Sequence, residues 1–215
     1  MLNIYTMSNN NNQILKIYKS RKNVLEIIDT LGYSVDDYLG FNYNEIDAML
    51  SNEQLDMLIE NPTTKQKIYI KYYLSSKQIR QGALDELIED LYNIENVLEK
   101  KDTLIVITED EPNDSIVTRM KYLFDHDGIF VVIHNIHRLQ FNILEHNLVP
   151  ECNILETVEE NELMKKLNIN KKSQLPEISR FDPQALALCM RPGNIAKFTR
   201  KSITALETNY YRVCV

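Results

Sequence analysis

The chain of 215 residues lacks the features that several classes of protein require. No stretch approaches the roughly 18 consecutive apolar residues of a membrane span. The amino terminus also lacks the basic and then apolar order of a secretory leader. We therefore expect an intracellular protein. Its three cysteines, Cys152, Cys189 and Cys214, stand at unrelated spacings, which excludes a disulfide framework and a CxxC metal knuckle and predicts free thiols.

Glycine and basic charge are also scarce. Five glycines, with no GxGxxG, GxSxG or Walker motif, give no indication of a phosphate-cradling loop, so we expect no cofactor and no small-molecule substrate. The net charge of −7 opposes autonomous binding to nucleic acid, which depends on clustered Lys and Arg. By contrast, 22 Asn and 24 Ile indicate A/T-rich coding, as in some large DNA viruses and some protists.

The charge changes along the chain. Residues 146–215 carry ten Lys and Arg against eight Asp and Glu, or +2, whereas residues 1–145 carry fourteen against twenty-three, or −9. This step predicts two domains, 13–145 and 146–215. Residues 1–12, which end in four asparagines and have no periodic apolar face, are expected to be disordered.

The first domain alternates predicted strands with predicted helices, which indicates an α/β domain with a mixed, partly parallel sheet. An amphipathic helix from Ile14 is expected to end at Gly32. Asp114 is the predicted N-cap of a later helix. We also predict a short helix from a capping box at Ser51 to Ile59. The predicted strands are Lys67–Leu74, Thr103–Ile107, Ile129–Ile133 and Leu139–Leu144.

The second domain has the pattern of a small α+β module, so the class expected for the whole chain is α+β. Thr157 and Glu160 are predicted to form a capping box. Asp182 is a predicted N-cap with Pro183 at the first helical position, and Gly193 suits a turn that needs positive φ. We expect these last three residues to define the fold and not to catalyse.

Two groups of residues suggest metal chemistry, although each also has an ordinary explanation. His134, His137, His146 and Cys152 have ligand types, but an HxxH pattern alone equally fits exposed imidazoles. The acidic run Glu109-Asp110-Glu111 after a predicted strand would suit a Mg²⁺-dependent nuclease, and it equally fits a solvated loop.

The strongest basic cluster of the acidic half lies on the polar side of the opening helix. It consists of Lys16, Lys19, Arg21 and Lys22. Amphipathic surface helices normally direct charge outward, so the cluster is expected to be a solvated face.

The last 70 residues carry a series of collinear motifs. They are His146-Asn147-Leu148-Val149-Pro150-Glu151, Leu175-Pro176-x-Ile178, Asp182-Pro183-x-Ala185, Gly193, Arg200-x-Ser202-x-Thr204-Ala205 and Tyr211-Arg212-x-Cys214. In order and spacing they resemble the fifth subunit shared by eukaryotic nuclear RNA polymerases, whose carboxy-terminal domain matches a small subunit of the archaeal enzyme. The chain length also fits the eukaryotic type, which adds an amino-terminal jaw domain.

This resemblance implies a non-catalytic subunit of a multisubunit DNA-dependent RNA polymerase, with no catalytic residue, metal or cofactor of its own. It implies docking on the largest subunit through the carboxy-terminal domain, and a jaw near downstream duplex DNA within the complex. It also implies a location in the nucleus if the source is cellular, or in a viral factory or virion if it is viral. A metal-dependent nuclease and a stand-alone interaction protein are the alternatives.

The resemblance and the strand pattern together give two sets of candidate site residues. Residues that alternate along an extended strand project to one side, so Arg200, Ser202 and Thr204 are expected to form, with Arg212, either an interface or a local hydrogen-bonded corner. The partner-interface candidates are His146, Val149, Pro150, Arg200, Ser202, Thr204 and Arg212, and the DNA-proximal candidates are Ser115, Arg119 and Lys121.

The chain departs from the family pattern at several positions. Cys152, Ile203 and Leu206 stand where a histidine, a glutamate and a small residue are usual. Pro112-Asn113-Asp114-Ser115 replaces the jaw's Thr-Pro-Ser-Ala loop. The carboxylate of Asp114 would repel phosphate, which opposes direct contact of this loop with DNA.

Overall fold

The computed structural model describes residues 2–202 and 204–215, with side chains from residue 12 onward. It contains both helices and strands in two compact units, residues 1–142 and 143–215, and confirms the α+β class. The division falls three residues before the predicted boundary. Among the described residues, no helix is long and apolar enough to cross a membrane.

The first unit is built on a four-stranded mixed sheet. Its strands are β1 (Met57–Glu60), β2 (Lys67–Tyr72), β3 (Thr103–Thr108) and β4 (Phe130–Asn135), in that spatial order. β1 is antiparallel to β2, whereas β2, β3 and β4 are parallel. The predicted mixed, partly parallel sheet is therefore correct.

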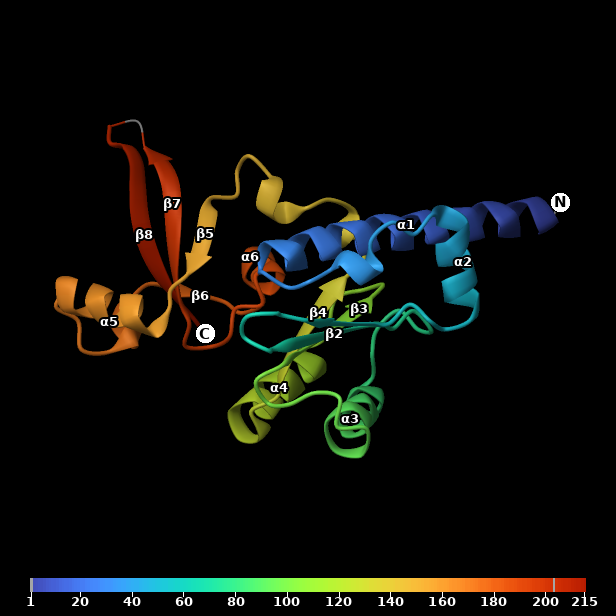
Figure 1. The fold of residues 1–215 in the computed structure, drawn as a ribbon, viewed down its shortest axis with the longest axis horizontal. Coiled ribbons are helices and arrows are strands. Elements are labelled where there is room, and N and C mark those ends of the chain that lie inside the picture. The colour runs from blue at the N-terminus through green and yellow to red at the C-terminus, as the bar shows by residue number, and fades with distance from the viewer. Residues whose placement is uncertain (1, 203) are drawn as a thin grey trace. The chain divides into compact units, whose positions relative to one another are not determined.

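Helices cover both faces of this sheet (Figure 1). The crossover helices α3 (Gln81–Glu89) and α4 (Asp114–Tyr122) lie on one face, and α1 (Leu2–Thr30) lies on the other. α3 and α4 each continue into one π-helical turn, Asp90–Ile94 and Leu123–Asp127. The remaining helical elements are α2 (Tyr43–Ser51) and the 3₁₀ turns Asp36–Tyr38 and Arg138–Gln140.

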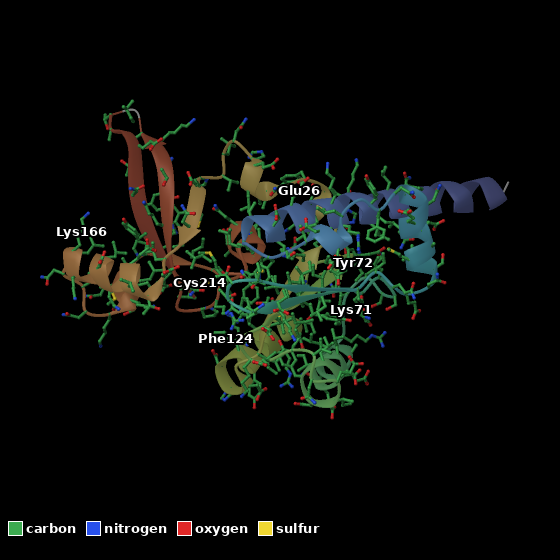
Figure 2. All side chains as sticks on the ribbon, viewed as in Figure 1. Glu26, Lys71, Tyr72, Phe124, Lys166 and Cys214 are labelled. Carbon is green, nitrogen blue, oxygen red and sulfur yellow. The ribbon has the colours of Figure 1, made fainter. Side chains whose placement is uncertain are left out.

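Burial explains why the four central residues of β3, 104–107, are all apolar. All six of its residues are buried, because α1 covers one face and the crossover helices cover the other. On the α1 face, the Tyr72 hydroxyl, labelled in Figure 2, lies 3.3 Å from the Ser20 hydroxyl of α1. Tyr72 is in register with Ile107, and Ile107 with His134.

Three local predictions for the first unit are wrong. Residues 57–60 form β1 and not the end of a helix, because Met57 and Ile59 are buried while their neighbours are exposed, which is a strand period. Residues 139–144 form no strand. The side-chain amides of Asn23 and Gln140 occupy the carbonyls of Leu139 and Ile136 at 2.8 and 2.9 Å. Finally, Asn113 and not Asp114 is the N-cap of α4.

The expected disordered start also differs from the structure, in which residues 2–12 are the first turns of α1. Buried Ile14, Ile17 and Val24 anchor the later turns of this helix. Once a helix is nucleated, each further residue adds at little cost, so a polar segment can extend it. Met1 lies outside the described residues.

The second unit contains a smaller four-stranded sheet. Its strands are β5 (Glu151–Ile154), β6 (Glu177–Ile178), β7 (Ile195–Ser202) and β8 (Leu206–Cys214), in the order β5-β7-β8-β6. The helical elements are α5 (Thr157–Lys166), α6 (Pro183–Ala187) and the 3₁₀ turns Ile143–Glu145 and Lys172–Gln174. The core consists of Leu163, Leu175, Ile195 and Val213, with Leu155, Ile169 and Tyr211 packed against it.

Two local features of this unit are those that the sequence predicts. Asp182 caps α6, because its Oδ1 accepts the Gln184 backbone N–H at 2.9 Å, and Pro183 opens the helix. Gly193 has φ of +89°, which favours glycine. The predicted capping box of α5 is shifted by one residue, from Thr157 and Glu160 to Glu156 and Glu159.

Buried His134 makes the stability of the first unit depend on pH. Burial, with a smaller contribution from Arg138, lowers the pKa of His134 to about 4. The ordinary value is near 6.5. Between these values the unfolded chain binds a proton that the folded chain excludes, so stability present above pH 6.5 is lost as the pH falls. We expect His134 to lower the free energy of unfolding by about 2 kcal/mol between pH 7.5 and pH 5.

Urea unfolding of His134→Asn should lack this part of the pH dependence. His137→Asn is the matched control, because His137 is exposed and follows the same strand. If His134→Asn loses as much stability on acidification as the unmodified protein, the assignment is wrong.

Candidate functional site

The second unit contains a groove of about 560 Å³ between the segment leading into β5 and the β7–β8 hairpin. It brings together three of the predicted interface residues, Val149, Pro150 and Arg200. The residues that line it are Asn147, Leu148, Val149, Pro150, Glu151, Thr199, Arg200, Lys201, Glu207 and Tyr210.

Hydrogen bonds fix the segment that forms one wall of the groove. The His146 carbonyl accepts the Val149 N–H at 2.8 Å. The His146 side chain accepts the Leu148 N–H through Nδ1 at 3.2 Å. Gln184 of α6 donates from Nε2 to the Pro150 carbonyl at 2.7 Å. His146 thus stabilises the turn through both its carbonyl and its side chain. No pattern in the sequence indicates the role of Gln184. The turn leaves the Leu148 side chain 86% exposed.

The other wall is the β7–β8 hairpin, whose register places the predicted polar residues. Arg200 lies opposite Thr208, and Ser202 lies opposite Leu206. Arg200 and Ser202 therefore share one face of the sheet, as expected. Beyond Thr199, which pairs with Glu151, β7 continues to Ser202 without a β5 partner.

Arg212 does not join Arg200, contrary to expectation. It lies opposite Ala196, four residues along β7 from Arg200. Its Nη1 donates to the Glu177 carbonyl at 2.8 Å, and its guanidinium carbon lies 5.8 Å from the centre of the Tyr210 ring. Arg212 therefore links β8 to the short strand β6.

Ser202 and Thr204 form a local hydrogen-bonded corner. Their hydroxyl oxygens lie 3.3 Å apart, and Ser202 Oγ also accepts the Ala205 N–H at 3.4 Å. Ile203, one of the departures from the family pattern, lies outside the described residues. Of the two alternatives, an interface or a local hydrogen-bonded corner, the geometry thus favours the corner for Ser202 and Thr204.

Charge around the groove is mixed. Arg200 and Lys201 line it from β7, Glu207 from β8 and Glu151 from β5. Among the described side chains, none of these four takes part in an ion pair. The groove therefore presents two cations and two anions that are available to a partner.

Glu160 holds the start of β7. Its Oε1 accepts the Ile195 N–H at 3.2 Å, and its Oε2 lies 2.6 Å from Lys172 Nζ. Lys172 Nζ also donates to the Gly193 carbonyl at 2.8 Å. The sequence indicated Glu160 only as part of a capping box, a role that Glu159 fills.

The structure does not gather the candidate metal ligands. Within residues 2–202 and 204–215, no three His, Cys, Asp or Glu side chains are placed to hold an ion together. His134 lies buried in β4, and burial raises the pKa of Cys152 to about 12, which keeps its thiol protonated. In the acidic run, Glu111 pairs with Arg138 at 2.6 Å.

The DNA-proximal candidates on α4 do not form one basic patch. Ser115 is in the first turn, and Arg119 follows four residues later on the same side. Arg119 Nε pairs with Asp85 at 2.9 Å, and its guanidinium carbon lies 5.2 Å from the Tyr122 ring centre. Lys121, two residues further on, points elsewhere around the helix.

Comparisons with known proteins place the second unit in a family. Residues 141–214 match the C-terminal domain of RNA polymerase Rpb5. The chain is 47% identical over 76 residues to DNA-directed RNA polymerase subunit Rpo5 of Thermococcus kodakarensis, which covers 35% of this chain and 92% of that protein. Rpo5 of Archaeoglobus fulgidus is 44% identical over 77 residues, covering 36% and 100%.

These matches define a subunit of an enzyme complex and not a catalyst in itself. The chain belongs to the Rpb5 family, whose archaeal members are named Rpo5. The shared region is the second unit, so it contains the groove, the Glu160 contacts and the hairpin.

Leu206 allows a test of the hairpin geometry. Its φ of +61° lies in the left-handed region, which is strained for leucine, and its side chain is 84% exposed. Glycine relieves strain of about 1–2 kcal/mol but loses more chain entropy on folding. We expect Leu206→Gly to raise the free energy of unfolding of the second unit by about 0.5 kcal/mol, the net of these effects.

Hydrogen exchange of β7 and β8 amides measures this change in the full chain. Leu148→Gly is the control, because Leu148 is equally exposed but is not among the residues with positive φ. A loss of stability in Leu206→Gly equal to that in Leu148→Gly would show that position 206 is unstrained.

Proposed function

We propose that this protein docks on the largest subunit of a multisubunit DNA-dependent RNA polymerase through its second unit, as a non-catalytic component. The observation that supports this most strongly is the groove, because it holds Val149, Pro150 and Arg200 and lies within the region shared with Rpo5. Two nearly fully exposed leucines, Leu148 and Leu206, adjoin the same segments.

The physical basis of docking is burial of these apolar side chains together with charge matching. Complete burial of a leucine side chain is worth roughly 1.5–3 kcal/mol. The unpaired charges of Arg200, Lys201, Glu151 and Glu207 would then set the orientation of the partner more than its affinity. No reaction is needed for this role.

Affinity purification of the tagged full chain from its source cells tests the proposal. We expect the largest polymerase subunit to be recovered, and at least tenfold less of it with Leu148→Asp or Leu206→Gly, because each variant removes an apolar contact. Val158→Asp is the control, since Val158 is 67% exposed on α5 of the same unit but outside the groove.

Two outcomes would contradict docking at the groove. Equal recovery with all variants would place the interface elsewhere. Recovery of partners without any polymerase subunit would favour the stand-alone interaction protein. The nuclease alternative gains no support, because among the described residues no three His, Cys, Asp or Glu side chains are placed to hold a metal ion together.

We also propose that the first unit serves as a jaw near downstream DNA only when the assembled polymerase holds it there. Residues 1–145 carry a charge of −9, and Arg119 is already paired with Asp85. Contact with duplex DNA would therefore depend on the high local concentration that assembly creates. The proposed location follows the polymerase, in the nucleus of a cellular source or in the factory or virion of a virus.

The isolated chain should bind random duplex DNA poorly. We expect a Kd weaker than about 10⁻⁴ M at physiological salt, because the net charge of the chain is −7 and one of the candidate cations on α4, Arg119, is paired with Asp85. Fluorescence anisotropy with a labelled duplex measures this Kd. The double variant Arg119→Ala, Lys121→Ala should change the Kd little. Binding that is tight and insensitive to salt would refute the assembly-dependent role.

A further inference from the structure

The first unit contains a pocket that the docking role does not use. α1, the start of α2 and the loop between residues 38 and 42 surround a pocket of about 330 Å³. This volume is near the lower end of the roughly 300–1,000 Å³ typical of small-ligand sites. Its walls are mainly apolar and aromatic, and include Tyr18, Leu25, Phe41 and Ile46.

Arg21 lines this pocket. The prediction of a solvated face is wrong for this residue, because its side chain is buried. It is only 3% exposed, and its Nη1 donates to the Leu55 carbonyl at 3.1 Å. Its Nε is buried without a hydrogen-bond partner. The guanidinium carbon lies 5.5 Å from the Phe41 ring centre and 5.8 Å from that of Tyr38.

The charge of Arg21 is therefore poorly compensated. Among the described side chains, none of the ion pairs includes it. Burial lowers its pKa, while Tyr72 and Tyr38 oppose this shift. A buried cation without an anionic partner is costly, and contact with aromatic rings offsets only part of that cost. An anion bound in the pocket would supply the missing partner.

The chemistry of the pocket indicates which anion would fit. A guanidinium binds carboxylates through paired hydrogen bonds, and apolar aromatic walls favour a hydrophobic group beside the charge. Duplex DNA needs several exposed cations in a row, whereas this cation is buried in a unit of net negative charge. Lys22 also lines the pocket, but its Nζ lies 3.7 Å from Glu26 Oε1, so Arg21 is the cation without an anionic partner there.

We propose that this pocket binds an acidic side chain of a partner protein, with Arg21 meeting the carboxylate and an adjacent apolar residue packing against Tyr38 and Phe41. The site lies within the first unit and is independent of the groove in the second. It would give the protein a separate contact for an acidic protein segment.

The test uses two peptides and the full chain. N-acetyl-Leu-Glu-Phe-amide is the probe, and the same peptide with Gln in place of Glu is the neutral control. Titrations followed by amide chemical shifts should show the Glu peptide perturbing residues 38–42 and binding at least tenfold more tightly than the Gln peptide.

A matched pair of variants localises the binding. Leu39 lines the pocket and is 51% exposed, so Leu39→Glu places a competing carboxylate beside Arg21 without disturbing the core. It should weaken binding of the Glu peptide at least tenfold. Ile94→Glu, at a residue 66% exposed and outside the pocket, should leave binding unchanged.

Several outcomes would overturn the proposal. These are no binding of the Glu peptide at millimolar concentration, equal binding of the Gln peptide, or equal effects of Leu39→Glu and Ile94→Glu. Displacement of the peptide by inorganic phosphate or by a short duplex at comparable concentration would assign the pocket to phosphate instead. None of these results depends on whether the second unit docks on a polymerase.

Discussion

The geometry of the second unit depends on one carboxylate. Ile195 is fully buried at the start of β7, and Glu160 accepts its N–H. The same carboxylate pairs with Lys172, which in turn donates to the Gly193 carbonyl beside the turn that precedes β7. A buried N–H without an acceptor would be costly, so this contact sets where β7 begins and therefore its register with β5 and β8. The groove and the placement of Arg200 follow from that register.

The cysteines of the second unit serve its packing. Burial raises the pKa of Cys189 to about 12 and that of Cys214 to about 11, so these thiols stay protonated. Cys214, at the end of β8 in Figure 2, contacts the Met190 carbonyl through its sulfur at 3.6 Å. Such groups support packing.

Sequence reasoning succeeded where one short segment determines the result. The apolar run of β3 and the Asp182-Pro183 start of α6 carry their own local signals. The sequence does not predict β1, because four residues show too few periods to separate a strand from a helix. It also fails to predict contacts that depend on distant residues. Gln184, Glu160 and Arg212 act on backbone groups 34 or 35 residues away, and no spacing rule reveals such contacts.

The β7–β8 hairpin extends beyond the end of β5, and this extension affects the behaviour of the free protein in a cell. Past Thr199 the edge of β7 has no β5 partner, and Leu206 stands exposed at the end of the same hairpin. Unpaired strand edges and exposed leucines promote self-association of a protein that has lost its partner. An excess of this chain over the other subunits of its complex would therefore favour self-association of the unassembled protein. Synthesis of all subunits in equal amounts would prevent it.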